Sequence, residues 1–84
     1  MTDETKEKLE FYLAKAEPLF AGLEAQEPKD ADWGRLRKEF LEMTLGYYRD
    51  ALHFKKKGEF LRALMALEYA EGWLDAGKRI GLFK

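Results

Sequence analysis

The sequence predicts an all-α fold, a three-helix antiparallel bundle with a tight hairpin between its second and third helices. Leu, Ala, Glu, Lys and Arg dominate the 84 residues, while Val is absent and Thr is scarce. Apolar residues recur at helical spacing in three segments. The last two of these segments are separated by so short a connection that they must lie antiparallel, side by side.

The composition limits the classes of function. We expect one domain, spanning residues 1–84. Cysteine is absent, which excludes disulfides and thiolate metal sites. The 15 basic and 16 acidic side chains nearly balance, so no broad field attracts nucleic acid or a membrane. No apolar run approaches the ~20 residues that span a bilayer, and we expect a cytoplasmic location. Abundant Glu and Lys without Asn or Cys is typical of thermophiles.

The first helix is expected at about 3–25. Thr2 or Asp3 can cap its free N–H groups, and apolar residues follow at a 3.6-residue period. Pro18 interrupts this helix and removes one backbone hydrogen bond. Because the apolar face continues beyond Pro18, we expect a kink rather than a break. A linker of about 25–31 follows.

The second helix is expected at about 32–57, beginning near Asp30 or Asp32. Aromatic residues recur along it every seven positions, which favours a core seam over a ligand shelf. They are Trp33, Phe40, Tyr47 and Phe54. Three lysines then complement the negative end of the helix dipole, and Gly58 supplies a left-handed cap.

The third helix is expected at about 59–77, and small residues form a stripe along it. The stripe consists of Ala63, Ala66, Ala70 and Gly77. Such a stripe allows the preceding helix to approach closely. Gly72 costs ~1 kcal/mol relative to Ala in mid-helix, so we expect a contact there that is too close for a methyl group. The apolar tail 78–84 is expected to fold back onto the bundle or to pack on a second subunit.

The hairpin resembles a single tetratricopeptide repeat between Thr44 and Gly77. The matching aromatic, small and turn positions are Tyr47, Ala51, Phe54, Gly58, Phe60, Ala63, Leu67 and Ala70. Asp75 stands where that repeat usually has a proline, and a lone repeat cannot bury its faces. We interpret this likeness as convergent packing of a helical hairpin.

A more specific resemblance lies in the segment "ALEYAEGWLDAGKRIGLF". The matching positions are Tyr69, Ala70, Gly72, Trp73, Leu74, Asp75, Ala76, Gly77, Gly81 and Leu82. This run is similar to the signature of a small archaeal family, domain of unknown function 357, and "GYYRDA" and "KKKGEFLRAL" also fit that family. The resemblance implies a small all-helical domain of archaeal origin. It implies no activity.

The residues needed for catalysis or metal binding are largely missing. Nucleophilic catalysis is not expected without Ser or Cys. Metal sites in helical bundles need Glu-x-x-His on two helices, and the chain has one His. Three residues lie between Arg49 and His53, whereas ribonucleases of the higher eukaryotic and prokaryotic nucleotide-binding group have four to six between the matching Arg and His. We therefore predict no enzyme, no cofactor and no metal.

Two surface clusters are candidate binding sites. The first combines an aromatic ring with charged groups, as binding hot spots often do, although local salt bridges also explain it. It comprises Trp73, Asp75, Lys78, Arg79 and Phe83. The second lies near the hairpin turn, where basic residues could contact phosphate or simply keep a helix end soluble. It comprises Lys55, Lys56, Lys57 and Arg62.

Three helices of this size cannot hide every aromatic residue, among them Phe11, Tyr12 and Tyr69. The leading hypothesis is therefore a non-enzymatic interaction module that forms a homodimer or binds an unidentified protein partner. The alternative is a helical nucleotide- or RNA-binding domain that uses the basic clusters and an aromatic ring for stacking.

Overall fold

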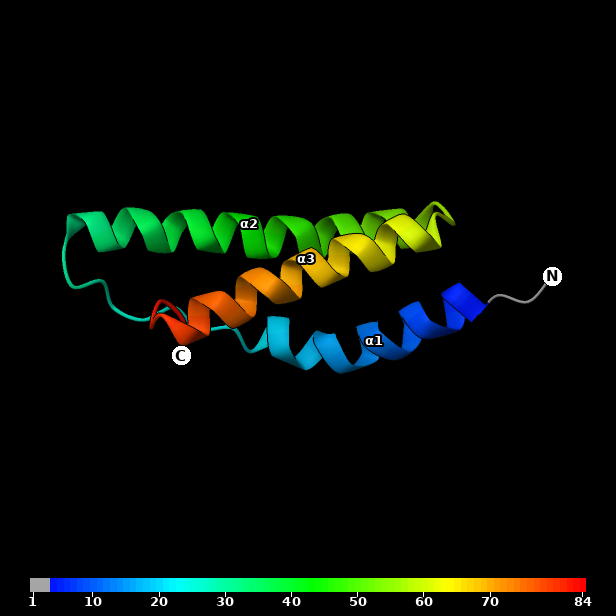
Figure 1. Ribbon diagram of the computed structural model, residues 1–84, viewed down its shortest axis with the longest axis horizontal. Coiled ribbons are helices and arrows are strands. Elements are labelled where there is room, and N and C mark those ends of the chain that lie inside the picture. The colour runs from blue at the N-terminus through cyan, green and yellow to red at the C-terminus, as the bar shows by residue number, and fades with distance from the viewer. Residues whose placement is uncertain (1–3) are drawn as a thin grey trace.

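The computed structural model describes residues 4–84, which form three helices and no strand. The helices are α1 (Glu4–Ala21), α2 (Ala31–Lys56) and α3 (Phe60–Arg79). Figure 1 shows α3 crossing obliquely between α2 and α1, so that α3 is the central helix. The molecule is elongated, with principal extents of 53 × 18 × 16 Å. The predicted all-α, three-helix fold is confirmed.

The first helix is shorter than the segment predicted at about 3–25. It continues through Pro18 without a break and ends at Ala21, where the amide of Gly22 donates to the carbonyl of Pro18 at 3.0 Å. Its buried face consists of Leu9, Leu13, Ala16 and Phe20. The predicted caps Thr2 and Asp3 lie outside the described residues.

Both ends of α2 carry the predicted signals. The Asp30 carboxylate accepts a hydrogen bond from the amide of Trp33 at 2.8 Å, and so caps one of the free N–H groups of the first turn. At the other end Gly58 adopts a left-handed φ of 77°, and the amide of Glu59 donates to the carbonyl of Phe54 at 2.9 Å. Only a glycine adopts this φ without strain, and the chain therefore reverses directly into α3.

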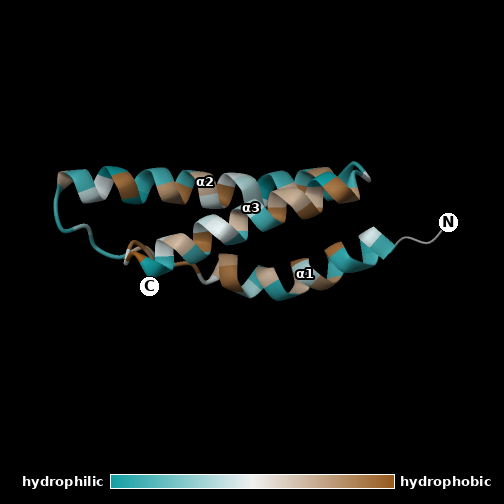
Figure 2. Ribbon diagram, viewed as in Figure 1, coloured by the Kyte–Doolittle hydropathy of each residue, from teal (hydrophilic) through white to brown (hydrophobic). Residues whose placement is uncertain are grey.

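Small residues line the contact between α2 and α3. Ala51 on α2 and Ala63 and Ala70 on α3 are fully buried, and Leu67 of α3 belongs to the same buried core. Close approach of the two helices explains why the stripe carries so little side-chain volume. Figure 2 shows apolar residues spaced along all three helices, with polar residues between them. The predicted small stripe of α3 is therefore an inner, buried face.

The C-terminal tail folds back onto the segment that follows α1 (Figure 1). The amide of Gln26 donates to the carbonyl of Leu82, and the amide of Lys84 donates to the carbonyl of Glu24, each at 2.8 Å. The side chains of Leu82 and Phe83 are buried. The tail thus covers the end of the bundle within one chain, which was one of the two expectations for it.

Gly77 is in close contact with another part of the chain, whereas the expectation of a tight contact at Gly72 is wrong within residues 4–84. The Phe83 ring packs directly on Gly77, so that a Cβ added there would overlap the ring. At Gly72 an added Cβ would meet no atom within 4 Å. Gly77 follows Gly72 by five positions, which places the two glycines about 140° apart around the helix, one facing the core and the other facing solvent.

Candidate interaction surface

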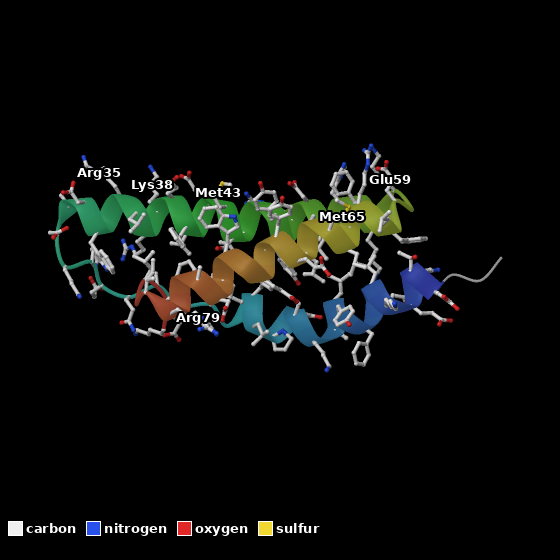
Figure 3. All side chains as sticks on the ribbon, viewed as in Figure 1. Arg35, Lys38, Met43, Glu59, Met65 and Arg79 are labelled. Carbon is white, nitrogen blue, oxygen red and sulfur yellow. The ribbon has the colours of Figure 1, made fainter. Side chains whose placement is uncertain are left out.

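An apolar groove of about 570 Å³ lies over α3 and the adjoining part of α2. Phe40 of α2 forms one side of it, and residues of α3 form the remainder. The lining residues are Phe40, Met65, Glu68, Tyr69, Gly72, Trp73 and Ala76. Figure 3 labels Met65 on α3, on the part of the helix that runs beside α2.

Aromatic pairs between the two helices fix the walls of the groove. Phe40 and Trp73 meet edge to face, with centroids 4.8 Å apart, and Tyr47 stacks on Tyr69 at 5.2 Å. Such pairs contribute roughly 0.5–1.5 kcal/mol each beyond the area they bury. Phe40, Tyr69 and Trp73, which line the groove, therefore each pack against a ring on the neighbouring helix.

The groove belongs to a longer apolar strip, which we call the outer face of α3. Its members are Leu61, Met65, Tyr69, Gly72, Ala76 and Ile80. Their spacing keeps them within about 100° of one another around the helix, and the centre of the strip lies about 120° from that of the buried stripe. Met65 is 53% exposed and Tyr69 60% exposed. Exposed apolar strips of this kind mark interaction sites more often than isolated exposed residues do.

One carboxylate, that of Glu68, borders the groove. It forms no ion pair with any residue in the range 4–84. Glu68 also borders a smaller cavity of about 150 Å³ that Tyr12 and Glu71 line. Burial there, with a smaller contribution from the Glu68 carboxylate, raises the pKa of Glu71 above its ordinary value.

The structure brings only part of the predicted cluster at the end of α3 together. Trp73 lines the groove, whereas Asp75 is exposed and accepts a hydrogen bond from the Arg79 guanidinium at 3.0 Å. Lys78 is also exposed, and it lies about 140° around the helix from Trp73. The inclusion of Phe83 is corrected: its side chain is 2% exposed because it packs against Gly77, so it belongs to the core and not to a surface.

The predicted basic cluster at the hairpin turn is exposed but partly neutralised. Its four residues, Lys55, Lys56, Lys57 and Arg62, are all exposed. Glu59 lies 3.8 Å from the Lys57 ammonium and 3.4 Å from the Arg62 guanidinium. Two of the four positive charges therefore face a carboxylate, which weakens the local field that a phosphate would meet.

The basic residues at the start of α2 do not form a single patch. Arg35 and Lys38 project from the side of α2 that faces away from α3 (Figure 3). Arg37 instead donates a hydrogen bond at 3.0 Å to the backbone carbonyl of Gln26, which ties the linker to α2.

Across residues 4–84, no group of three or more His, Asp or Glu is placed to hold a metal ion. In the same range, no helix is both long and apolar enough to cross a membrane.

These features define a small all-α protein, a helical hairpin braced by a third helix, with an open apolar groove. A model of the family described as a protein of unknown function, DUF357, matches residues 8–83. The chain belongs to that family, which confirms the resemblance seen in its C-terminal half. Neither the curated proteins nor the solved structures yielded a match. The family description assigns no activity, and the likeness to a tetratricopeptide repeat is unconfirmed.

Proposed function

We propose that this protein is a non-enzymatic protein–protein interaction module that forms a homodimer through the outer face of α3. The observation that carries the proposal is the groove itself, an exposed apolar surface whose aromatic walls pack against one another across α2 and α3. Burial of such a surface is the main favourable term in most protein associations. We also place the protein in the cytoplasm of a thermophilic archaeon, as the composition and the family resemblance suggest.

The chemistry of the groove favours apolar contact over catalysis. Its lining is aromatic and aliphatic, with Glu68 as the one carboxylate. General acid–base catalysis usually requires ionisable groups whose pKa values are shifted toward the working pH. The carboxyl whose pKa is raised, that of Glu71, lies instead against the smaller cavity beside Tyr12. The groove is therefore better suited to hold a side chain or a helix than to transform a substrate.

Nucleotide or RNA binding has weaker support. The cluster that would contact phosphate is the one in which Glu59 faces Lys57 and Arg62. Salt distinguishes the two functions, because phosphate contacts weaken steeply as salt rises whereas apolar association holds or strengthens.

The test is the mass in solution, measured by light scattering over a range of protein concentrations at low and moderate salt. We expect the mass to rise from 9.8 kDa toward that of a dimer as the concentration increases, at both salt levels. A strict monomer at millimolar concentration would contradict the proposal. RNA binding that disappears at moderate salt, without dimerisation, would favour the alternative.

A matched pair of variants assigns the effect to the groove. Tyr69→Lys places a charge on the outer face of α3, and Phe11→Lys places the same charge on α1, where Phe11 is 56% exposed. Each substitution also removes one intramolecular aromatic pair, Tyr47–Tyr69 or Phe11–Tyr12. We expect Tyr69→Lys to abolish the dimer and Phe11→Lys to leave it intact. Equal effects from the two variants would contradict the assignment.

A further inference from the structure

We propose that the occupant of the groove is α3 of a second copy, packed antiparallel so that the two outer faces cross at Gly72 and Ala76. This inference rests on the proposed self-association and adds its geometry. A two-fold axis midway between these residues sets Gly72 of each copy against Ala76 of the other. Because the same strip then serves both copies, the contact closes into a dimer and does not extend into a fibre.

Gly72 is the first observation in favour of this geometry. A glycine in the middle of a helix costs roughly 0.5–1 kcal/mol relative to alanine, and no atom of residues 4–84 approaches Gly72 closely enough to require it. Ala76 follows one turn later on the same strip, and both residues line the groove. Two helices whose small residues meet at the crossing point can approach closely enough for their flanking side chains to interlock.

The arrangement of larger side chains around this point is the second observation. Tyr69 and Ile80 lie on opposite sides of the crossing, and both are exposed. In the antiparallel arrangement Tyr69 of one copy lies beside Ile80 of the other. The positions 69, 72, 76 and 80 repeat at intervals of three and four residues, the spacing of a helix–helix seam.

Charge selects the antiparallel direction. The same two-fold axis brings the Glu68 carboxylate of each copy, which forms no ion pair within residues 4–84, next to Arg79 of the other. Arg79 is exposed, and its existing pair with Asp75 lies at the surface, where such pairs contribute little and exchange readily. A parallel pairing would instead place the two Glu68 carboxylates on opposite flanks of the seam, each about 16 Å along the helix from Arg79, so this attraction would be lost.

The size of the contact predicts a weak dimer. The two helices overlap from Glu68 to Ile80, a length of about 20 Å on a cylinder about 10 Å across. Such a strip, even with Phe40 and Trp73 at its edge, is small beside the ~800 Å² per partner of a standard stable interface. The dimer should therefore form only at high protein concentration.

Charge reversal tests the geometry separately from the self-association. In sedimentation equilibrium we expect Glu68→Arg and Arg79→Glu each to weaken the dimer about tenfold, because each change turns two attractive pairs into repulsive ones. The double variant should restore wild-type affinity. If the wild type dimerises but the double variant gives no rescue, this geometry is wrong while the proposed function survives. If the wild type does not dimerise, both fail.

A second variant probes the crossing point. Gly72→Leu fills the floor of the groove at a position where the monomer has open space. Leucine is also a better helix former than glycine, so circular dichroism should show helicity retained. We expect the dimer to be lost. A dimer of unchanged affinity in Gly72→Leu would contradict a crossing at this residue.

Discussion

Small residues occur on both faces of α3, but those of the inner face are buried whereas Gly72 of the outer face is exposed. On the inner face Ala63 and Ala70 are fully buried, and Gly77 lies under the Phe83 ring. On the outer face Gly72 faces open space, between exposed apolar side chains. A small residue in a helix therefore does not by itself show that another part of the same chain approaches it closely.

The largest expected difference between the faces comes from removing a large side chain on each. Leu67 is 1% exposed, so Leu67→Ala should lower the free energy of unfolding by about 2–5 kcal/mol through lost burial and a residual cavity. Met65→Ala, on the outer face, should change it by no more than about 0.5 kcal/mol. Urea denaturation of dilute protein measures both values. Similar losses would show that the outer face contributes to the monomer core.

Gly77→Ala should have the next largest effect. The added methyl group overlaps the Phe83 ring, and overpacking of this kind typically costs about 1–3 kcal/mol. Because Phe83 anchors the tail, hydrogen exchange should also accelerate at the amides of Gln26 and Lys84, whose hydrogen bonds hold the tail to the linker. Unchanged exchange at these two amides would show that the ring can move without releasing the tail.

Gly72→Ala is the matched change on the outer face, and its effect should have the opposite sign. The methyl group meets nothing, and alanine has the higher helix propensity, so we expect the monomer to gain roughly 0.5–1 kcal/mol in stability. Thermal or urea denaturation at a concentration below that of dimerisation measures this gain. A loss of stability would indicate an intramolecular role for Gly72.

The smallest expected effect concerns Glu71, at the edge between the two faces. Folding raises the pKa of its carboxyl, so the charged form is disfavoured in the folded state. The contribution of Glu71 to stability should therefore fall as the pH rises from the unfolded-state pKa to the folded-state pKa. Glu71→Gln should be slightly more stable than the wild type at pH 7, and the difference should vanish in acid. Urea titrations at both pH values test this, and a less stable Glu71→Gln at pH 7 would contradict it.

Local signals made much of the fold predictable. Asp30 and Gly58 mark the ends of α2 because a capping carboxylate and a left-handed glycine act within a few residues of their own position. The buried stripe of α3 was predictable because the short turn leaves α2 as its neighbour. The end of α1 was less predictable, since apolar residues continue past Ala21 into the linker.

The candidate site was only partly predictable. Trp73 was identified from its residue type, whereas the grouping of Phe40 with Met65 and Tyr69 depends on how α2 and α3 cross. The four-residue spacing of Leu61, Met65 and Tyr69 was a signal that could have revealed the outer face. Phe83 was wrongly predicted to lie on the surface. The chain reverses at Gly81, which has a φ of 85°, and the tail then pairs with the linker. Both features depend on contacts between residues that are distant in sequence.

The length of the molecule affects how its assembly must be measured. A body of 53 × 18 × 16 Å experiences more friction than a sphere of equal mass. On a gel-filtration column a single copy would elute early, at a volume that spherical standards assign to a heavier particle. Rotational diffusion would also be anisotropic, so nuclear relaxation would vary with the direction of each bond. Apparent size from elution alone would therefore overstate the number of copies, whereas scattering and sedimentation equilibrium report mass directly.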